Sequence, residues 1–319
     1  MKYWVINKNQ YEKMLCHIGS GDLQNADIIV FGNEGGAGGK PLYAIIEGIE
    51  RYAPKGFGEN QVTSTLDLNG NWDAGFWDTS AIICEQMAFE IMQENNVKLP
   101  DKGFVKGGFL QYCARISLAI EDTKNDIDYW FKPMGQNTEA AHHIKEYIRE
   151  GLFQPRKGIQ TFIMDWRPLP RPNQNWWGEE YSVIDKDRFF LAFNLKSRKE
   201  YCDEFTNYSK DALRRKEILK NAILTSRAKV IIGFGEVDTK QNLIKEILDL
   251  SLSDFKEITV DGVTVKAFAC RKKYEVKNDE LNIFLLPFPV AGKGPFKNGE
   301  EMNKFYTYIA RNIKELLKV

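Results

Sequence analysis

Short apolar runs alternate with longer amphipathic segments along this chain. Four of the runs have the length and the β-branched and aromatic content of buried strands, and they cover residues 26–31, 159–164, 228–232 and 281–286. Helical spacing of apolar residues marks five longer segments: 42–52, 140–149, 210–225, 242–250 and 300–317. Strands that alternate with helices predict an α/β fold, in which helices flank both faces of a central, mostly parallel sheet.

The long interval between the first two strands predicts an insertion. Residues 32–158 are far more than one crossover helix and its loops need. We expect an inserted subregion at about 54–135, with helices near residues 80–93 and 108–120. The other strands and helices fit a single domain over residues 1–319.

Composition excludes some classes of protein. Lys plus Arg and Asp plus Glu number 44 each, so a nucleic-acid-binding protein of this composition must gather its basic residues on one face. The five cysteines are scattered without a C-x-x-C pair, which argues against a disulfide framework, a structural zinc site or an iron–sulfur cluster. No signal peptide and no run of roughly 20 apolar residues is apparent. We expect a cytoplasmic protein with no metal, cofactor, membrane contact or obligate protein partner.

The segments that follow the four predicted strands are the places to look for a site, because parallel sheets bind ligands at the carboxyl ends of their strands. The first strand runs into a glycine-rich turn at residues 32–39. The segments after the other three strands begin at Asp165, Gly233 and Pro287. We expect these four segments to meet at one rim of the sheet.

The glycine-rich turn does not match the common phosphate-binding patterns. The Walker pattern fails because Pro41 follows Lys40 and because Glu34 stands where the first glycine belongs, and Pro41 also breaks a dinucleotide fingerprint begun at Gly36. Five glycines in eight positions nevertheless let the backbone approach a ligand closely, with the Glu34 carboxylate at the mouth of that approach. A flexible connector between strand and helix is the alternative.

The order of these strand ends resembles the uracil-DNA glycosylase superfamily over roughly half of the chain. The segment 32–36, Gly-Asn-Glu-Gly-Gly, falls on the family's first motif, whose catalytic residue positions water or stabilises the sugar cation. Asp165 falls on the Asn that reads the base edge. Residues 286–289, Leu-Pro-Phe-Pro, fall on the H-P-S-P-like motif, whose His supports the departing base and whose loop enters the duplex.

The resemblance implies a role for each matched residue. Glu34 is the catalytic carboxylate with Asn33 beside it, and the base contacts are Asp165, Trp166, Gly35 and Gly36. Side chains that flank the proposed cleft are the candidate DNA contacts: Arg167, Arg171, Phe288, Lys293 and Lys297. Solvated surface is the alternative for the four basic residues. Phe288 and the loop behind it suit a wedge that fills the gap left by a flipped nucleotide, with a buried turn as the alternative. The implied partner is double-stranded DNA with one nucleotide flipped out of the stack.

Three positions depart from the family pattern: Gly35 replaces Pro, Leu286 replaces the His and Asp165 replaces the Asn. An ionised Asp only accepts hydrogen bonds, which suits the exocyclic amino group of cytosine and opposes O4 of uracil. Unmodified cytosine is excluded, because its removal would destroy the genome. We therefore predict a hydroxymethylated or glucosylated cytosine of phage DNA as the substrate. An ion pair between Asp165 and Arg167 or another Arg is the alternative role for this carboxylate.

Two tryptophan-rich segments contain candidates for contacts to a substituent on the base: Trp72, Trp77, Trp176 and Trp177. Such rings stack on bases or sugars, or they dock on the core of their own domain. The adjacent His142 and His143 face different directions on a helix and do not indicate a metal site. No Lys is marked as a nucleophile, which favours a monofunctional glycosylase. A uracil glycosylase with variant motifs and a non-catalytic nucleic-acid-binding module are the alternatives.

Overall fold

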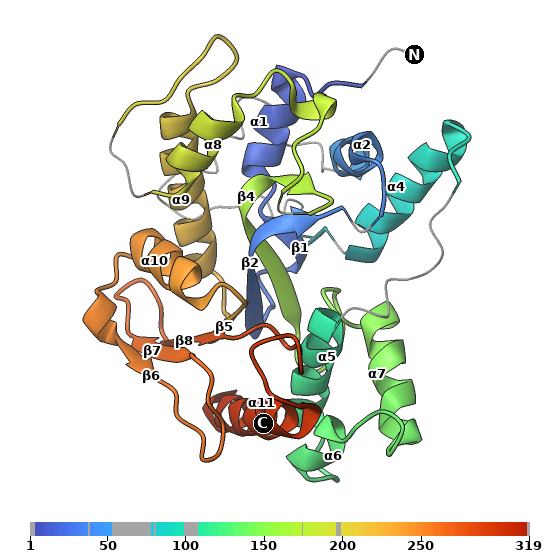
Figure 1. Cartoon of the computed structure of the whole chain (residues 1–319), viewed down its shortest axis with the longest axis vertical. Helices are drawn as coiled ribbons and strands as arrows, with labels where there is room; N and C mark the ends of the chain where they lie inside the picture. Colours follow the sequence, from blue (N-terminus) through green and yellow to red (C-terminus); the bar gives the residue numbers. More distant parts are fainter. Residues whose placement is uncertain are drawn as a thin grey trace.

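A mixed sheet forms the centre of the computed structural model (Figure 1), which describes residues 4–37, 39–52, 78–79, 81–98, 108–173, 175–195 and 199–317. Its strands are β1 (Gly19–Asp22), β2 (Ile28–Gly36), β3 (Asp78–Thr79), β4 (Thr161–Arg171), β5 (Val230–Phe234), β6 (Phe255–Glu257), β7 (Phe268–Lys272) and β8 (Leu281–Leu286). In the described ranges the strand order is β3-β1-β4-β2-β5-β8-β7-β6. The four central strands β4, β2, β5 and β8 are parallel, and the strands at both edges pair antiparallel.

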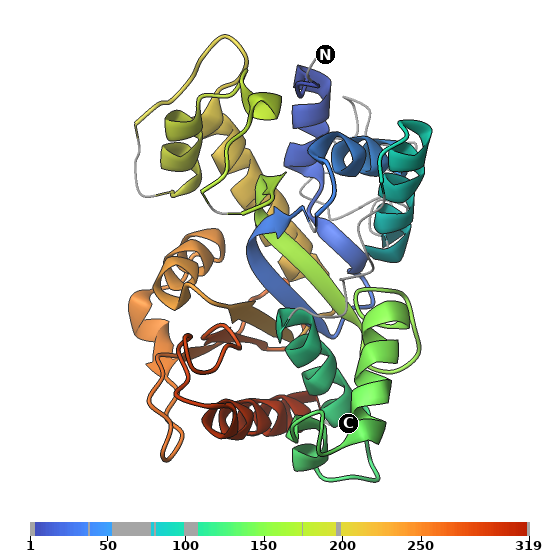
Figure 2. The same cartoon turned by 45° about the vertical axis from the view of Figure 1, so that its right-hand side comes forward.

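Helices cover both faces of this sheet (Figures 1 and 2), which confirms the predicted α/β class. They are α1 (Lys8–Cys16), α2 (Leu42–Tyr52), α4 (Ala81–Glu94), α5 (Gly108–Glu121), α6 (Ile127–Phe131), α7 (Thr138–Glu150), α8 (Lys186–Phe193), α9 (Tyr208–Thr225), α10 (Val237–Ile247) and α11 (Gly299–Leu317). In the described ranges, no helix combines the length and the apolar character needed to cross a membrane.

Two hydrophobic cores lie on opposite faces of the sheet, because successive residues of a strand point to opposite sides. Ile29 and Ile231 face a first core that α1, α2, α8, α9 and α10 complete. Val30 and Ile232 face a second core that α5, α6, α7 and α11 complete. The central strands are therefore apolar on both faces, as the continuous apolar runs in the sequence predicted.

The region expected as an insertion does not form a separate unit where it is described. Helix α4 packs on α2 through Ala88, Ile91 and Met92, which contact Ala44. Helices α5 and α6 belong to the second core of the sheet. Residues 53–77, 80 and 99–107 of this region lie outside the described ranges.

Two segments predicted as loops are instead continuations of strands. Strand β2 extends through the glycine-rich segment to Gly36, and β4 extends to Arg171. The two strands remain paired as far as Gly36 and Arg171, with a register shift after Glu34. Local sequence favours turns at Gly and Pro, whereas the pairing between these strands adds backbone hydrogen bonds that no local pattern contains.

Candidate functional site

A pocket of about 520 Å³ opens at the carboxyl ends of the parallel strands. Residues from β2, β4 and β5 line it, together with Phe288 from the segment after β8. This confirms that the four segments after the predicted strands meet at one rim. In the order β4-β2-β5-β8, the chain connections diverge at β2 and β5. Such a switch point is where open α/β sheets bind their ligands.

The Glu34 carboxylate is held by two arginines on one wall of this pocket. Arg171 Nη2 lies 2.7 Å and Arg171 Nε 3.1 Å from Glu34 Oε2, and Arg167 Nη1 lies 3.3 Å from the same oxygen. Parallel pairing places Glu34 directly beside Arg167, and the bulge after Glu34 brings Arg171 to the carboxylate as well. The Glu34 side chain is 13% exposed, so it keeps a small opening toward the pocket.

Both guanidinium groups also lie over the ring of Phe190, at 4.9 Å for Arg167 and 4.7 Å for Arg171. Arg171 is buried. The two arginines predicted to contact phosphate therefore pair with Glu34, and a phosphate contact by Arg171 would require this buried ion pair to open.

Asp165 presents its carboxylate to the pocket from β4 and is partly buried there. It lies beside Gly32 of β2, where a side chain would collide: an added Cβ would lie 2.1 Å from Asp165 Oδ1. Within the described residues the Asp165 carboxylate accepts no hydrogen bond. The sequence left open an ion pair between Asp165 and Arg167, but Arg167 pairs with Glu34 instead. Burial raises the pKa of Asp165 to about 6, although the charges of Arg215 and Lys240 act in the opposite direction.

The backbone of Asp165 is fixed from behind by Arg215, a fully buried residue of α9. Its guanidinium donates to the carbonyl oxygens of Asp165 and Trp166, and to those of Leu15 and His17 at the end of α1. One side chain thus ties the end of a helix to the pocket strand and satisfies carbonyls that the helix itself cannot.

Lys240 reaches the same pocket from α10 and was not identified from the sequence. It is only 3% exposed. Its stem passes Gly233, where an added Cβ would lie 2.9 Å from Lys240 Cδ. Burial lowers the pKa of Lys240 to about 8, while the carboxylates of Glu236 and Asp165 act in the opposite direction.

A sequence signal for Lys240 exists in the spacing of the helix. Val237, Leu243, Ile244 and Ile247 form an apolar stripe, and Lys240 lies on that stripe. The prediction began this helix at residue 242 and so left Lys240 in a loop.

Asn33 and Glu236 connect the ends of β2 and β5 across the mouth of the switch point. Asn33 Nδ2 donates to Glu236 Oε2 at 2.5 Å. Glu236 has a φ of 44°, a left-handed conformation that is unusual for a residue other than glycine and that is often found at functional sites. Asn33 Oδ1 is buried without a hydrogen-bond partner in the described structure, so this edge of the pocket holds an unused acceptor.

Three phenylalanines form an apolar part of the pocket lining. Phe109 of α5 meets Phe234 of β5 edge to face at 5.4 Å, and it lies nearly parallel to Phe288 at 6.3 Å. Phe288 is 43% exposed. The sequence indicated Phe288 alone, since Phe109 comes from a helix in the region expected as an insertion. Faces of this kind stack on planar ligands.

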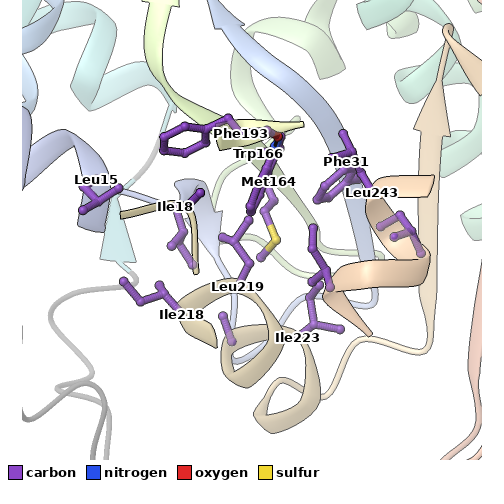
Figure 3. Packing of buried hydrophobic residues seen from close by; sticks show 14 of the residues in the cluster. Leu15, Ile18, Phe31, Met164, Trp166, Phe193, Ile218, Leu219, Ile223 and Leu243 are labelled. Carbon is purple, nitrogen blue, oxygen red and sulfur yellow. Dashed lines mark hydrogen bonds between the residues drawn. The ribbon is translucent and has the colours of Figure 1, made fainter. Parts of the chain in front are cut away.

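The prediction that Trp166 contacts the base is wrong. Trp166 is fully buried in the first core, where its Nε1 donates to the carbonyl of Phe193 at 2.6 Å (Figure 3). Because neighbouring strand residues point to opposite faces, a strand that directs Asp165 into the pocket must direct Trp166 away from it. By contrast, Gly35 and Gly36 do line the pocket.

Trp176 and Trp177, the described residues of the tryptophan-rich segments, pack on the core of their own domain. Trp176 and Trp177 both contact Tyr181, and Trp177 also packs on Phe189 and Phe190. This favours the structural alternative for both. Trp72 and Trp77 lie outside the described residues.

The segment after β8 differs from the motif that it resembles. Leu286 is fully buried in the second core, so the position expected to hold the supporting His does not face the pocket. Lys293 and Lys297 are exposed and do not line the pocket, which leaves them as candidates for contacts to DNA outside it.

His142 and His143 both lie against Glu146, at 3.0 and 3.5 Å. In the described ranges, no three His, Cys, Asp or Glu side chains are grouped so that they could hold a metal ion. The pocket lining itself includes the carboxylates of Glu34 and Asp165, the ammonium group of Lys240 and phenylalanine rings.

Comparisons of the chain with family models, with curated proteins and with solved structures find no match.

Proposed function

We propose that this protein is a DNA glycosylase that flips a modified cytosine into the pocket and hydrolyses its N-glycosidic bond, which leaves an abasic site. A hydroxymethylated or glucosylated cytosine of phage DNA is the substrate that we favour. The observation that carries this proposal is the Asp165 carboxylate, which faces the pocket without a hydrogen-bond donor among the described residues.

A partly buried carboxylate without a donor raises the free energy of the empty pocket, and a ligand that donates to it recovers that free energy. With a pKa of about 6, Asp165 is mostly ionised at neutral pH and acts as an acceptor. The N4 amino group of cytosine is the matching donor, whereas O4 of uracil would place two acceptors face to face. This argument favours cytosine derivatives over uracil.

The size and walls of the pocket suit a substituted base. Its volume of about 520 Å³ lies within the range of pockets that enclose small molecules, and it exceeds the needs of a bare pyrimidine ring. Phe109 and Phe288 offer faces on which the ring can stack. The remaining space allows a substituent at C5 of the base.

Glu34 is the carboxylate that we assign to the reaction itself. Departure of the base builds positive charge on the sugar, as in glycoside hydrolysis, and a fixed anion near C1′ stabilises that charge. Arg171 and Arg167 hold the carboxylate in one place. The water that adds to C1′ gives its oxygen to the sugar and its proton to the solvent or the base.

The test is incubation of the protein with duplexes that contain uracil, cytosine, hydroxymethylcytosine or glucosylated hydroxymethylcytosine, followed by alkaline cleavage at abasic sites. We expect cleavage of one or both modified cytosine duplexes only. Cleavage of the uracil duplex alone would overturn the cytosine assignment in favour of a uracil glycosylase with variant motifs.

A non-catalytic nucleic-acid-binding module is the second candidate, and the buried Leu286 favours it, since the residue that usually supports the departing base is missing. Binding to modified duplexes without any abasic site would support this candidate. Multiple turnovers of excision would exclude it.

A further inference from the structure

Lys240 and Asp165 both line the pocket and offer it a donor and an acceptor. We propose that the Lys240 ammonium donates to N3 or O2 of the flipped cytosine, both to recognise the base and to assist its departure. This inference rests on the proposed glycosylase function. It assigns to α10 a task that the family motif places at the end of the last strand, where this chain has the buried Leu286.

Lys240 is a buried lysine with no partner of its own in the described structure. Its side chain is almost completely buried, lines the pocket and passes so close to Gly233 that a side chain there would collide with it. Among the described residues, its ammonium group forms no hydrogen bond and no ion pair within 4 Å. A buried charge without such a partner is costly unless a ligand completes its contacts. By comparison, the buried Lys277 donates to the carbonyl of Ser226 and, at 3.4 Å, to that of Ile223.

The donors and acceptors of the two residues also match those of cytosine. The pairing edge of cytosine offers a donor at N4 and acceptors at N3 and O2. Asp165 supplies an acceptor and Lys240 supplies donors, so the two residues match this edge from N4 to O2. Uracil offers an acceptor at O4, which would oppose Asp165, and a donor at N3, which would oppose a Lys240 ammonium at that atom, whereas its O2 accepts as in cytosine. A contact from Lys240 to N3 therefore adds to the selection of cytosine by Asp165, and a contact to O2 serves the departure of the base alone.

The reaction requires no oxidant or further reactant besides water. The bond between C1′ and N1 breaks, and its electron pair moves onto the base, where negative charge accumulates at O2 and N3. Lys240 stabilises that charge and gives a proton to the base. Water forms the new bond to C1′ and releases a proton to the solvent, which reprotonates Lys240.

A neutral Lys240 amine that attacks C1′ is the competing role. In that case Nζ would bond to C1′ as the base leaves, and ring opening would give an imine that leads to strand cleavage. Borohydride reduces such an imine to a stable link between protein and DNA. A donor role leaves nothing for borohydride to trap.

The test uses the full chain with Lys240→Met and, as a matched control, Lys277→Met. Both lysines are buried, and burial lowers the pKa of each to about 8. Single-turnover excision of hydroxymethylcytosine and its glucosylated form is measured, together with the affinity for a duplex that carries a tetrahydrofuran abasic-site analogue. We expect Lys240→Met to slow excision by about 100-fold or more while its affinity for the analogue stays unchanged. Lys277→Met should excise at the wild-type rate at 25 °C.

The outcomes separate the two proposals. If the wild type excises a modified cytosine and Lys240→Met does so equally fast, the role of Lys240 is wrong and the glycosylase stands. If the wild type excises no base, both proposals fail. If borohydride links the wild type, but not Lys240→Met, to the DNA, that result would show that Lys240 attacks C1′ as a nucleophile and does not act as a donor. The wild-type excision rate should fall as the pH passes about 8, where Lys240 loses its proton. If the rate of Lys240→Met falls in the same pH range, the inference is wrong, and this comparison does not depend on the absolute rate.

Discussion

Gly32 and Asp165 are direct neighbours across β2 and β4, and the carboxylate of Asp165 occupies the space that a side chain on residue 32 would need. The first glycine of the segment thus makes room for a neighbouring side chain. The absence of a Cβ on one strand sets the position of the proposed base reader on the next.

Gly32→Ala should displace Asp165, because an added Cβ would lie 2.1 Å from Oδ1. We expect a loss of stability of about 1–3 kcal/mol and at least a tenfold lower excision rate. Urea denaturation and single-turnover excision measure the two effects. Gly135→Ala is the control, since a Cβ there meets no atom within 4 Å. Equal activity of the two variants would show that the position of Asp165 is unimportant.

Asp165→Asn should stabilise the protein at neutral pH. The pKa of Asp165 is about 6 in the folded state and about 3.8 when unperturbed, so folding favours the protonated form. Stability therefore decreases as the pH rises from about 4 to 6. Above pH 6 the protein keeps this lower stability, because the partly buried carboxylate is ionised. The shift corresponds to roughly 3 kcal/mol at most, and contact with water in the open pocket reduces it to about 1–2 kcal/mol. Thermal melts should show a higher Tm for Asp165→Asn at pH 7.5 and none of this gain at pH 4.

The same substitution should change the preferred base. An amide can donate to O4 of uracil, while it no longer offers N4 of cytosine two acceptor oxygens. We expect excision of the modified cytosine to decrease by about 10- to 100-fold, which corresponds to about 1–3 kcal/mol, and uracil excision to increase. Competition between the two duplexes measures the ratio. An unchanged ratio would mean that Asp165 does not contact the base edge.

The rate of excision should have a bell-shaped dependence on pH. Ionisation removes the O–H donor of Asp165 and makes both of its oxygens stronger acceptors, so the rate should rise as the pH passes about 6. Lys240 gives a proton to the departing base only as an ammonium group, so the rate should fall as the pH passes about 8. Because the two groups interact, both limbs belong to the pair. A single-turnover profile between pH 5 and 9.5 tests this, and a rate that keeps rising above pH 8 would contradict a protonated Lys240.

Glu34→Gln should lower excision by about 100- to 1,000-fold, because the amide cannot stabilise the cationic sugar. Binding to DNA should be unchanged or tighter, since Arg167 and Arg171 lose the negative charge with which they pair. Excision assays and binding isotherms for the abasic-site analogue at constant salt concentration separate the two effects. Excision at the wild-type rate would remove Glu34 from the mechanism.

The sequence by itself determined the elements whose signals are local. Helix α2 and strand β8 lie at the predicted bounds, and β5 and α9 lie within a few residues of theirs. Burial of an apolar run and the spacing of an amphipathic helix depend on near neighbours in the chain, so they are visible without the fold. The rule that parallel strands present their carboxyl ends together was enough to bring Glu34 and Asp165 to one rim.

Only the tertiary structure decided what each side chain at that rim does. Pairing between β2 and β4 turned two predicted loops into strands, and the resulting alternation sent Asp165 into the pocket and Trp166 into the core. Packing of α5 and α10 brought Phe109 and Lys240 to the site from distant parts of the chain. These contacts depend on register and on which face a residue occupies, and a shift of one position reverses the face. A linear sequence contains the residues of such a site, whereas long-range pairing determines which of them meet.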